Sequence, residues 1–158
     1  MVRVNKIIRD QKYLEYVKKN QKAEKDRIFC RHDMPHFLDV ARIAWILVLE
    51  EGLNVEKEVV YAAALLHDTG RWIEYENGED HAVSSARLSE EILVRNDFNR
   101  IEINMISDAI GSHRNMESNS DLSRVLYKSD KLSRNCLMCS AIGECKKFRN
   151  GEIPFLDY

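Results

Sequence analysis

The chain has 158 residues, 44% of them hydrophobic, which is enough to bury the core of one globular domain. Its 24 basic and 26 acidic residues give a formal net charge of −2, and this balance argues against a general attraction to nucleic acid or to a membrane surface. The longest apolar run is far shorter than the ~20 residues that span a bilayer, and the first residues lack the apolar core of a signal peptide. We therefore expect one cytoplasmic domain over residues 1–158.

The pattern of apolar residues predicts an all-α fold, since prolines and glycines are few and few segments alternate polar with apolar residues. An amphipathic helix is expected from residue 4 to about residue 20. The polar run 18–27 either continues this helix or connects it to the next one. Asp33 is expected to cap a second helix, which has Pro35 in its first turn, runs to Gly52 and is apolar on nearly every side.

The rest of the chain predicts four more helices. They are expected over residues 55–67, 81–94, 99–111 and 122–134. Asn54, Asp80 and Asn99 are the expected caps of the first three, and Asn99 forms a capping-box pattern with Glu102. Gly70 and Gly78 indicate a loop between residues 70 and 78.

A His-Asp pair ends the helix that precedes this loop. The sequence AAALLHDTG, residues 62–70, delivers His67 and Asp68 directly from an apolar segment. An imidazole and a carboxylate in an apolar setting are costly unless something compensates them. A bound divalent cation is the simplest compensation, because both groups ligate metals when deprotonated. The pair therefore predicts a metal site whose other ligands come from elsewhere in the chain.

Further ligands are available at the ends of other predicted helices. The histidines of the chain are His32, His36, His67, His81 and His113. Four of them fall at predicted helix starts or ends, where side chains from separate helices can converge on one pocket. Asp130 lies inside the last predicted helix among apolar neighbours. Each residue alone is more typical of a core or surface position, but the joint arrangement favours a shared site.

These residues resemble the motif of the HD superfamily of metal-dependent phosphohydrolases. His36, in HFLDVA, matches the first histidine of the family; the pair in LLHDTG matches its His-Asp doublet; and Asp130, in SDK, matches its distant aspartate. The resemblance covers roughly residues 30–135. It implies an HD-domain helical bundle with a metal site between its helices, and it leaves a cysteine-bearing tail at residues 136–158.

Many members of this superfamily bind a second metal through two intervening histidines, and His81 and His113 occupy matching places. The set then looks like the dinuclear site of dinucleoside-polyphosphate hydrolases, although Ala82 stands where that subgroup usually has glycine. Alternatively, His81 and His113 bind substrate phosphate beside one metal. The expected metal ligands are His36, His67, Asp68, His81, His113 and Asp130, with His67 and Asp68 as the catalytic pair.

Oxygen and nitrogen donors without thiolate suit Fe, Mn, Zn, Mg or Ni, so one or two divalent ions of unspecified identity are expected. Asp68 is the candidate bridging ligand of a metal pair. Phosphoryl transfer depends on positioning and electrostatics, so cations beside the ligands are candidate phosphate contacts. These are Arg71, Arg114 and Lys131, with Arg134 a weaker candidate; each is as consistent with an ordinary surface cation.

Three residues near the motifs have a structural and a functional interpretation. His32 stands one turn before His36, and we favour a peripheral or structural role for it. Trp72 and Tyr75 follow the doublet and could stack on a base, but packing at the rim is the simpler interpretation.

The tail carries Cys136, Cys139 and Cys145, and Cys30 is the remaining cysteine. Four thiolates could form a structural zinc site that holds the tail against the core. Inert thiols, or a redox disulfide between Cys136 and Cys139, are the alternatives.

The sequence therefore predicts a metal-dependent phosphohydrolase that acts on a nucleotide or a related small phosphate ester. A homodimer is compatible with the resemblance, and no nucleic-acid or membrane partner is expected. Two other classes stay open: a catalytically silent nucleotide-binding or signalling module, and a protein whose metal is structural and whose tail serves a partner. No serine or cysteine nucleophile motif accompanies the histidines.

Overall fold

The computed structural model describes residues 1–115 and 120–158, and these residues form helices and no strand. The helices are α1 (Val2–Arg9), α2 (Gln11–Ala23), α3 (Met34–Glu50), α4 (Lys57–Leu66), α5 (Arg71–Asn77), α6 (His81–Arg95), α7 (Arg100–Ser112) and α8 (Asp121–Leu132), followed by the 3-10 helices η1 (Ile142–Glu144) and η2 (Lys146–Phe148). The all-α prediction is confirmed. Within the described ranges, no helix is both long and apolar enough to cross a membrane.

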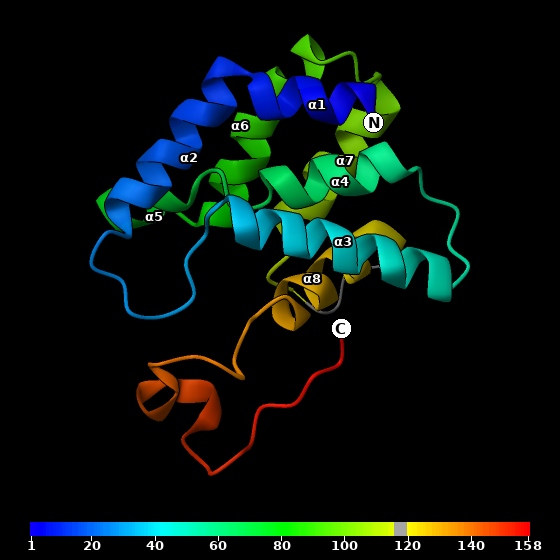
Figure 1. Cartoon of the computed structure of the whole chain (residues 1–158). Coiled ribbons are helices and arrows are strands. Elements are labelled where there is room, and N and C mark those ends of the chain that lie inside the picture. Colours follow the sequence, from blue (N-terminus) through cyan, green and yellow to red (C-terminus); the bar gives the residue numbers. More distant parts are fainter. Residues whose placement is uncertain (116–119) are drawn as a thin grey trace.

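Helix α4 occupies the centre of the bundle. It contacts α3 most extensively and also touches α1, α6, α7 and α8 (Figure 1). Its last turns, residues 62–66, are completely buried, and three of these residues are alanines. Small side chains let neighbouring helices approach from several sides, which is why the chain that leaves α4 enters the middle of the molecule. The layout places His67 and Asp68 in the interior.

The expected helix over residues 4–20 is wrong, because two helices occupy this region. The chain breaks at Asp10, whose backbone is extended and whose carboxylate accepts hydrogen bonds from the backbone N–H groups of Lys12 and Tyr13. A short acidic side chain competes well for the first free N–H groups of a helix, so it ends α1 and begins α2. Its carboxylate also pairs with Arg95 of α6 at 3.0 Å, which fixes the bend against the bundle.

Two further boundaries differ from the predictions. The loop expected over residues 70–78 is the short helix α5, which ends at Gly78 with a left-handed backbone (φ 80°). Helix α4 follows Glu56 rather than Asn54. The caps at Asp33, Asp80 and Asn99 are confirmed, and Asn99 and Glu102 form the expected capping box.

Helix α1 is attached to the bundle by Arg3. Its Nε lies 2.8 Å from Glu58 of α4, its Nη1 lies 2.7 Å from Glu102 of α7, and its guanidinium stacks on the Phe98 ring at 4.2 Å. The arginine side chain is 19% exposed, so water screens these contacts only in part. Because α1 buries little besides Val4 and Ile7, the arginine carries much of its attachment.

We expect Arg3→Ala to lower the free energy of unfolding by about 2 kcal/mol, since charge-assisted hydrogen bonds to two helices are lost together. Urea denaturation measures the change. Arg9→Ala, at an exposed position of the same helix, is the control and should stay within about 0.5 kcal/mol of the wild type. Equal effects of the two substitutions would contradict the assigned role of Arg3.

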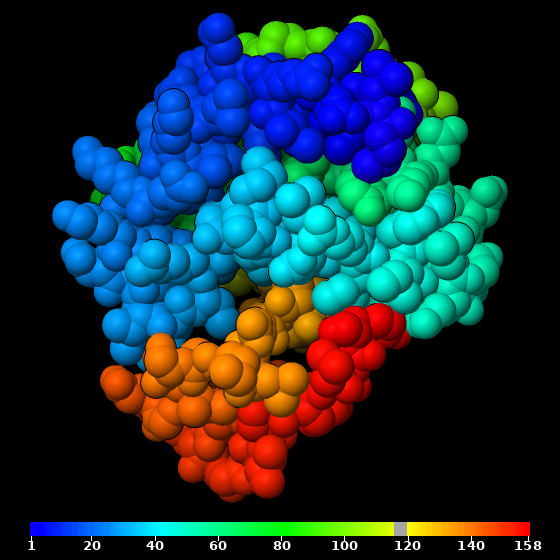
Figure 2. Space-filling model, viewed as in Figure 1, coloured from blue at the N-terminus to red at the C-terminus, as the bar shows by residue number. Residues whose placement is uncertain are grey.

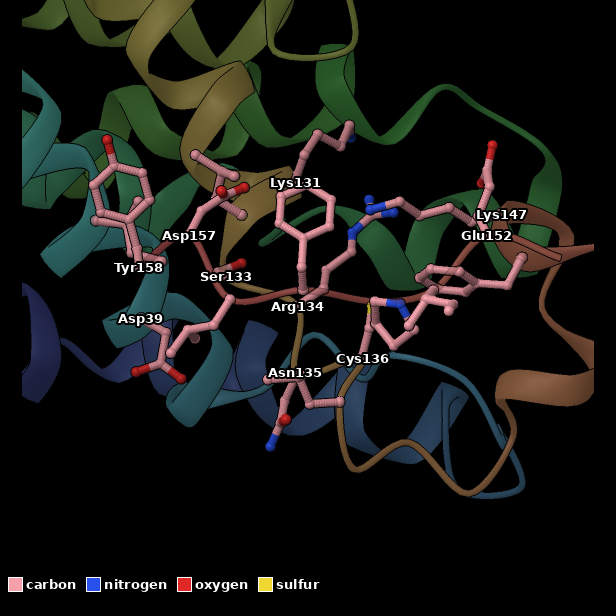
Figure 3. Close-up of a pocket in the computed structure, with 18 of the residues that line it drawn as sticks. Asp39, Lys131, Ser133, Arg134, Asn135, Cys136, Lys147, Glu152, Asp157 and Tyr158 are labelled. Atoms are coloured by element: carbon pink, nitrogen blue, oxygen red, sulfur yellow. The ribbon is translucent and has the colours of Figure 1, made fainter.

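The C-terminal segment, residues 133–158, leaves α8 and returns toward α3. Its last residue, Tyr158, donates a hydrogen bond from its hydroxyl to Glu50 Oε2 at 2.8 Å. Between this segment, the middle of α3 and the end of α8 lies a cavity of about 840 Å³ (Figure 3), with Asp39 and Tyr158 on one side and Lys147 and Glu152 on the other. The tail therefore touches the bundle at both of its ends and spans a gap between them.

Candidate metal centre

The six predicted ligands converge from five parts of the fold. His36 lies in the first turn of α3, His67 and Asp68 follow α4, His81 begins α6, His113 follows α7, and Asp130 lies in the last turn of α8. Their ligand atoms form two groups, each with all atoms within 4.8 Å of one another. The groups are His36, His67, Asp68 and Asp130, and Asp68, His81 and His113. Asp68 belongs to both.

The two carboxylate oxygens of Asp68 face different groups. Oδ2 lies 3.1 Å from His67 Nε2 and 3.9 Å from His36 Nε2. Oδ1 lies 3.2 Å from His81 Nε2 and 3.6 Å from His113 Nε2. A carboxylate with one oxygen toward each group has the arrangement of a ligand that bridges two metal ions.

The donor atoms also fit a metal because they are buried without other partners. His36 Nε2, His67 Nε2 and Asp68 Oδ1 form no hydrogen bond within the described residues. Buried polar atoms are normally satisfied, so unpartnered nitrogen and oxygen atoms that converge on one point fit a bound cation. In two histidines of the centre the other ring nitrogen is fixed: His67 Nδ1 donates to the Ala64 carbonyl at 2.7 Å and His113 Nδ1 donates to the Ile110 carbonyl at 2.6 Å. A carbonyl only accepts, so each Nε2 keeps its lone pair for a metal.

The electrostatics of the centre favour ionised carboxylates. Burial raises the pKa of Asp68, but the neighbouring His67 and His32 imidazoles lower it more, and the net pKa lies well below its usual value. The pKa of Asp130 is also lowered: burial raises it, but the charges of His67 and Lys131 and the hydrogen bond from Lys131 together lower it more. The carboxylates are therefore ready to ligate a cation at neutral pH.

His36 is held in its neutral form instead. Burial, aided by repulsion from His67, lowers its pKa from 6.5 to about 4. In metal-free protein we expect the His36 ring signals in NMR spectra to titrate near pH 4, so that the ring is neutral at pH 6. Because the pKa is lower in the folded state than in the unfolded state, protonation of His36 favours unfolding. The free energy of unfolding therefore falls as the pH drops from about 6.5 toward 4. A midpoint near pH 6.5 would contradict the burial of this ring.

Three residues that hold the centre were not found from the sequence. Asn20 of α2 is fully buried; its Nδ2 donates to the backbone oxygen of Asp68 at 2.8 Å and its Oδ1 accepts from the backbone N–H of Trp72 at 2.9 Å. Glu74 of α5 lies 2.5 Å from His81 Nδ1, which directs His81 Nε2 to the centre. No sequence motif marks either residue: Asn20 is distinguished by its burial and Glu74 by its contact with His81.

The third residue, Glu24, explains the place of His32. Glu24 is buried, accepts from His32 Nδ1 at 2.5 Å and accepts from the His32 backbone N–H at 2.8 Å. His32 Nε2 then lies 3.7 Å from Asp68 Oδ2. His32 therefore stands at the edge of the centre, in agreement with the peripheral role that the sequence favoured.

A cavity of about 790 Å³ opens over the centre, and all four cations named from the sequence line it. Arg71 lies 3.2 Å from Glu74 and its Nη1 rests against the His81 ring. Arg114 pairs with Asp80 at 2.9 Å. Lys131 and Arg134 both reach Asp130 Oδ2, at 2.5 Å and 3.5 Å. All four thus contact the ligands or the residues beside them.

The two aromatic candidates do not line this cavity. Trp72 is half-buried on α5, with Lys19 Nζ 4.2 Å above its ring. The Tyr75 hydroxyl donates to Glu24 at 2.8 Å and accepts from Arg27 at 2.9 Å. The arrangement supports packing at the rim for both residues.

The four cysteine thiols are free, and no three of their sulfur atoms lie within 4.8 Å of one another. The four-thiolate zinc site stays a prediction, beside the alternatives of inert thiols and a disulfide. Cys30 and Cys145 line the cavity over the metal centre from opposite parts of the chain, whereas Cys136 lines the neighbouring cavity.

Known proteins resemble this chain over most of its length. A protein of Clostridium beijerinckii described as uncharacterized is 47% identical over 145 residues, which is 92% of each chain. The crystal structure of a predicted HD superfamily hydrolase from an uncultured Thermotogales bacterium has a TM-score of 0.62 and 29% identity, covering 83% of this chain and 72% of the other. Ribonuclease Y of Mycoplasma mycoides is 29% identical over 120 residues, or 76% of this chain, which spans only 26% of that relative.

The family model of the HD domain matches residues 34–135. The match begins just before His36 and ends beyond Asp130, so it contains all six residues that converge on the candidate centre. The matched range agrees with the range of roughly residues 30–135 over which the sequence motifs resemble the family. This chain belongs to the HD domain family.

Proposed function

We propose that this protein is a metal-dependent phosphohydrolase that acts on a nucleotide or a related small phosphate ester. The observation that carries the proposal is the position of Asp68, whose two oxygens each face a separate group of buried histidine nitrogens below a cation-lined cavity. His36, His67, Asp68 and Asp130 would hold a first divalent ion, and His81 and His113 would complete a second site with Asp68. If one ion binds, His81 and His113 are free to contact phosphate.

A divalent ion held by these residues would lower the pKa of a coordinated water and neutralise charge on the attacked phosphate. The residues of the chain supply the rest. Arg71 and Arg114, which both pair with Glu74, and Lys131, which pairs with Asp130, line the cavity and would orient a phosphate over the ligands. Glu74 and Asn20 keep His81 and Asp68 in place, which preserves the geometry on which positioning depends.

The test is phosphate release after reconstitution with each candidate ion. Protein stripped with a chelator is loaded with Fe, Mn, Zn, Mg or Ni and assayed with p-nitrophenyl phosphate, nucleotides and dinucleoside polyphosphates. The proposal expects turnover with at least one ion and none in the stripped protein. Tight binding of a nucleotide without turnover, under every ion, would instead favour a silent binding module.

A second candidate reaction is cleavage of a phosphodiester bond in RNA. It is favoured by the relation to ribonuclease Y, although this chain matches only about a quarter of that protein. A single-stranded RNA in the same assay separates the two reactions. Metal-dependent cleavage of RNA, with no release of phosphate from small esters, would favour this alternative.

A further inference from the structure

The C-terminal segment forms part of the wall of the cavity over the metal centre. After α8 the chain folds through η1 and η2, and residues 143–146 and Arg149 line the same space as His36, Asp68 and Asp130. The space-filling view shows this segment, in orange, below the blue residues that lead into α3, with a hollow between them (Figure 2). Any ligand that reaches the metal centre through this cavity therefore passes beside the tail.

The cavity is far more positive than the protein as a whole. Seven lysines and arginines line it against three carboxylates, in a chain whose formal net charge is −2. Two of those carboxylates belong to Asp68 and Asp130, which a bound divalent ion would neutralise. The third is Glu144. Charges of one sign in a concave site concentrate ligands of the opposite sign, so the cavity is suited to a strongly anionic ligand.

The seven cations fall into two sets. Arg27, Arg71, Arg114, Lys131 and Arg134 each have a carboxylate within 4.0 Å, and all except Arg27 touch the metal ligands or their neighbours. The remaining two, Lys146 and Arg149, come from the tail. Within residues 1–115 and 120–158 neither has a carboxylate partner or a contact with a metal ligand, and both are exposed to the cavity. Their charges are free for a ligand.

We propose that Lys146 and Arg149 form a second anion subsite, which binds a phosphate group other than the one placed at the metal centre. The proposal rests on the proposed function and narrows it: the substrate is a small molecule with at least two phosphate groups. One phosphate lies over the ligands between Arg71 and Lys131, and another reaches the tail wall. A cavity of about 790 Å³ has the size of sites that enclose small molecules rather than long chains.

Calorimetric titration with inorganic phosphate and with tripolyphosphate tests the subsite, with a divalent ion that the protein binds in excess over the tripolyphosphate. The wild type should bind tripolyphosphate at least about tenfold more tightly than phosphate, since a second set of charge-assisted contacts is available. The double variant Lys146→Ala, Arg149→Ala should lose about tenfold in tripolyphosphate affinity and stay within about twofold for phosphate.

The matched control is Lys147→Ala with Arg42→Ala. It removes one lysine and one arginine that line the neighbouring cavity, so the net charge changes equally. This control should bind both anions as the wild type does. An equal loss in the control, a parallel loss for phosphate in the test variant, or no loss at all would overturn the subsite.

A short single-stranded oligonucleotide without a terminal polyphosphate is the third ligand. If it binds the wild type as tightly as tripolyphosphate and depends equally on Lys146 and Arg149, the assignment to a small molecule is wrong. Binding needs no turnover, so the two proposals separate. If the double variant loses its preference for tripolyphosphate but the wild type hydrolyses nothing under any metal, the subsite stands and the hydrolase proposal is wrong. If the protein hydrolyses phosphate esters and neither residue affects tripolyphosphate binding or hydrolysis, the hydrolase proposal stands and the subsite is wrong.

Discussion

Asp68→Ala is expected to lower kcat/KM for any phosphate ester that the protein hydrolyses by roughly a thousandfold or more. Loss of a residue that only orients a metal ligand commonly costs 10- to 100-fold, and Asp68 faces both ligand groups directly. The variant should also lose metal, since each group then lacks one donor. Elemental analysis beside a phosphate-release assay measures both effects on the same protein.

The fold should survive this substitution. The backbone oxygen of Asp68 is held by Asn20 Nδ2 at 2.8 Å, and alanine keeps that bond. Far-ultraviolet circular dichroism should therefore match the wild type. Asp108→Ala, which removes an exposed carboxylate from α7, is the control and should leave rate and metal content unchanged. Retained turnover in Asp68→Ala would exclude the proposed mechanism.

Gly70→Ala is expected to destabilise the protein by about 1–3 kcal/mol and to reduce metal binding at the group that contains His81. The backbone of Gly70 has ordinary angles (φ −91°, ψ 6°), so the cost is one of space. An added Cβ would lie 2.7 Å from the Ser84 Cβ and 2.7 Å from the Ser85 backbone nitrogen. Helix α6 would have to move, and His81 is its first residue.

Urea denaturation and metal stoichiometry together measure the effect of Gly70→Ala. Gly111→Ala is the control: its added Cβ would find only the Ala86 Cβ at 3.8 Å, and in helix α7 alanine should add about 0.5–1 kcal/mol of stability. If Gly70→Ala were as stable as the wild type with full metal content, the close approach of α6 to the His-Asp doublet would not be required.

The residues of the candidate centre could be named from the sequence because their signals are local. His67 and Asp68 follow a run of buried alanines and leucines, His81 begins the helix that Asp80 caps, and His113 follows the end of the helix that starts at the Asn99 capping box. Caps of this kind fix where a helix begins, and so they fix the positions of the side chains at its ends. The fold class followed from the same pattern.

The supporting residues could not be found in this way. Asn20 and Glu24 lie in a run of lysines, glutamines and acidic residues that is typical of a solvated surface, yet both are buried beside the centre. Their role depends on α2 folding back past α5, and a tertiary contact of that kind leaves no periodic signal. Lys146 and Arg149 were missed for the same reason, because the path of the tail after α8 is not set by helical periodicity.

The spread of the ligands along the chain has a consequence for the order of folding. Contacts between α3 and α4, or between α6 and α7, close short loops and form early, whereas the centre needs positions 36 and 130 together. Packing of α3 against α4 brings His36, His67 and Asp68 together, but Asp130 joins this group only when α8 packs against them. The complete set of metal ligands therefore forms only when the whole bundle has assembled. We expect the protein to reach its full metal affinity at that stage of folding.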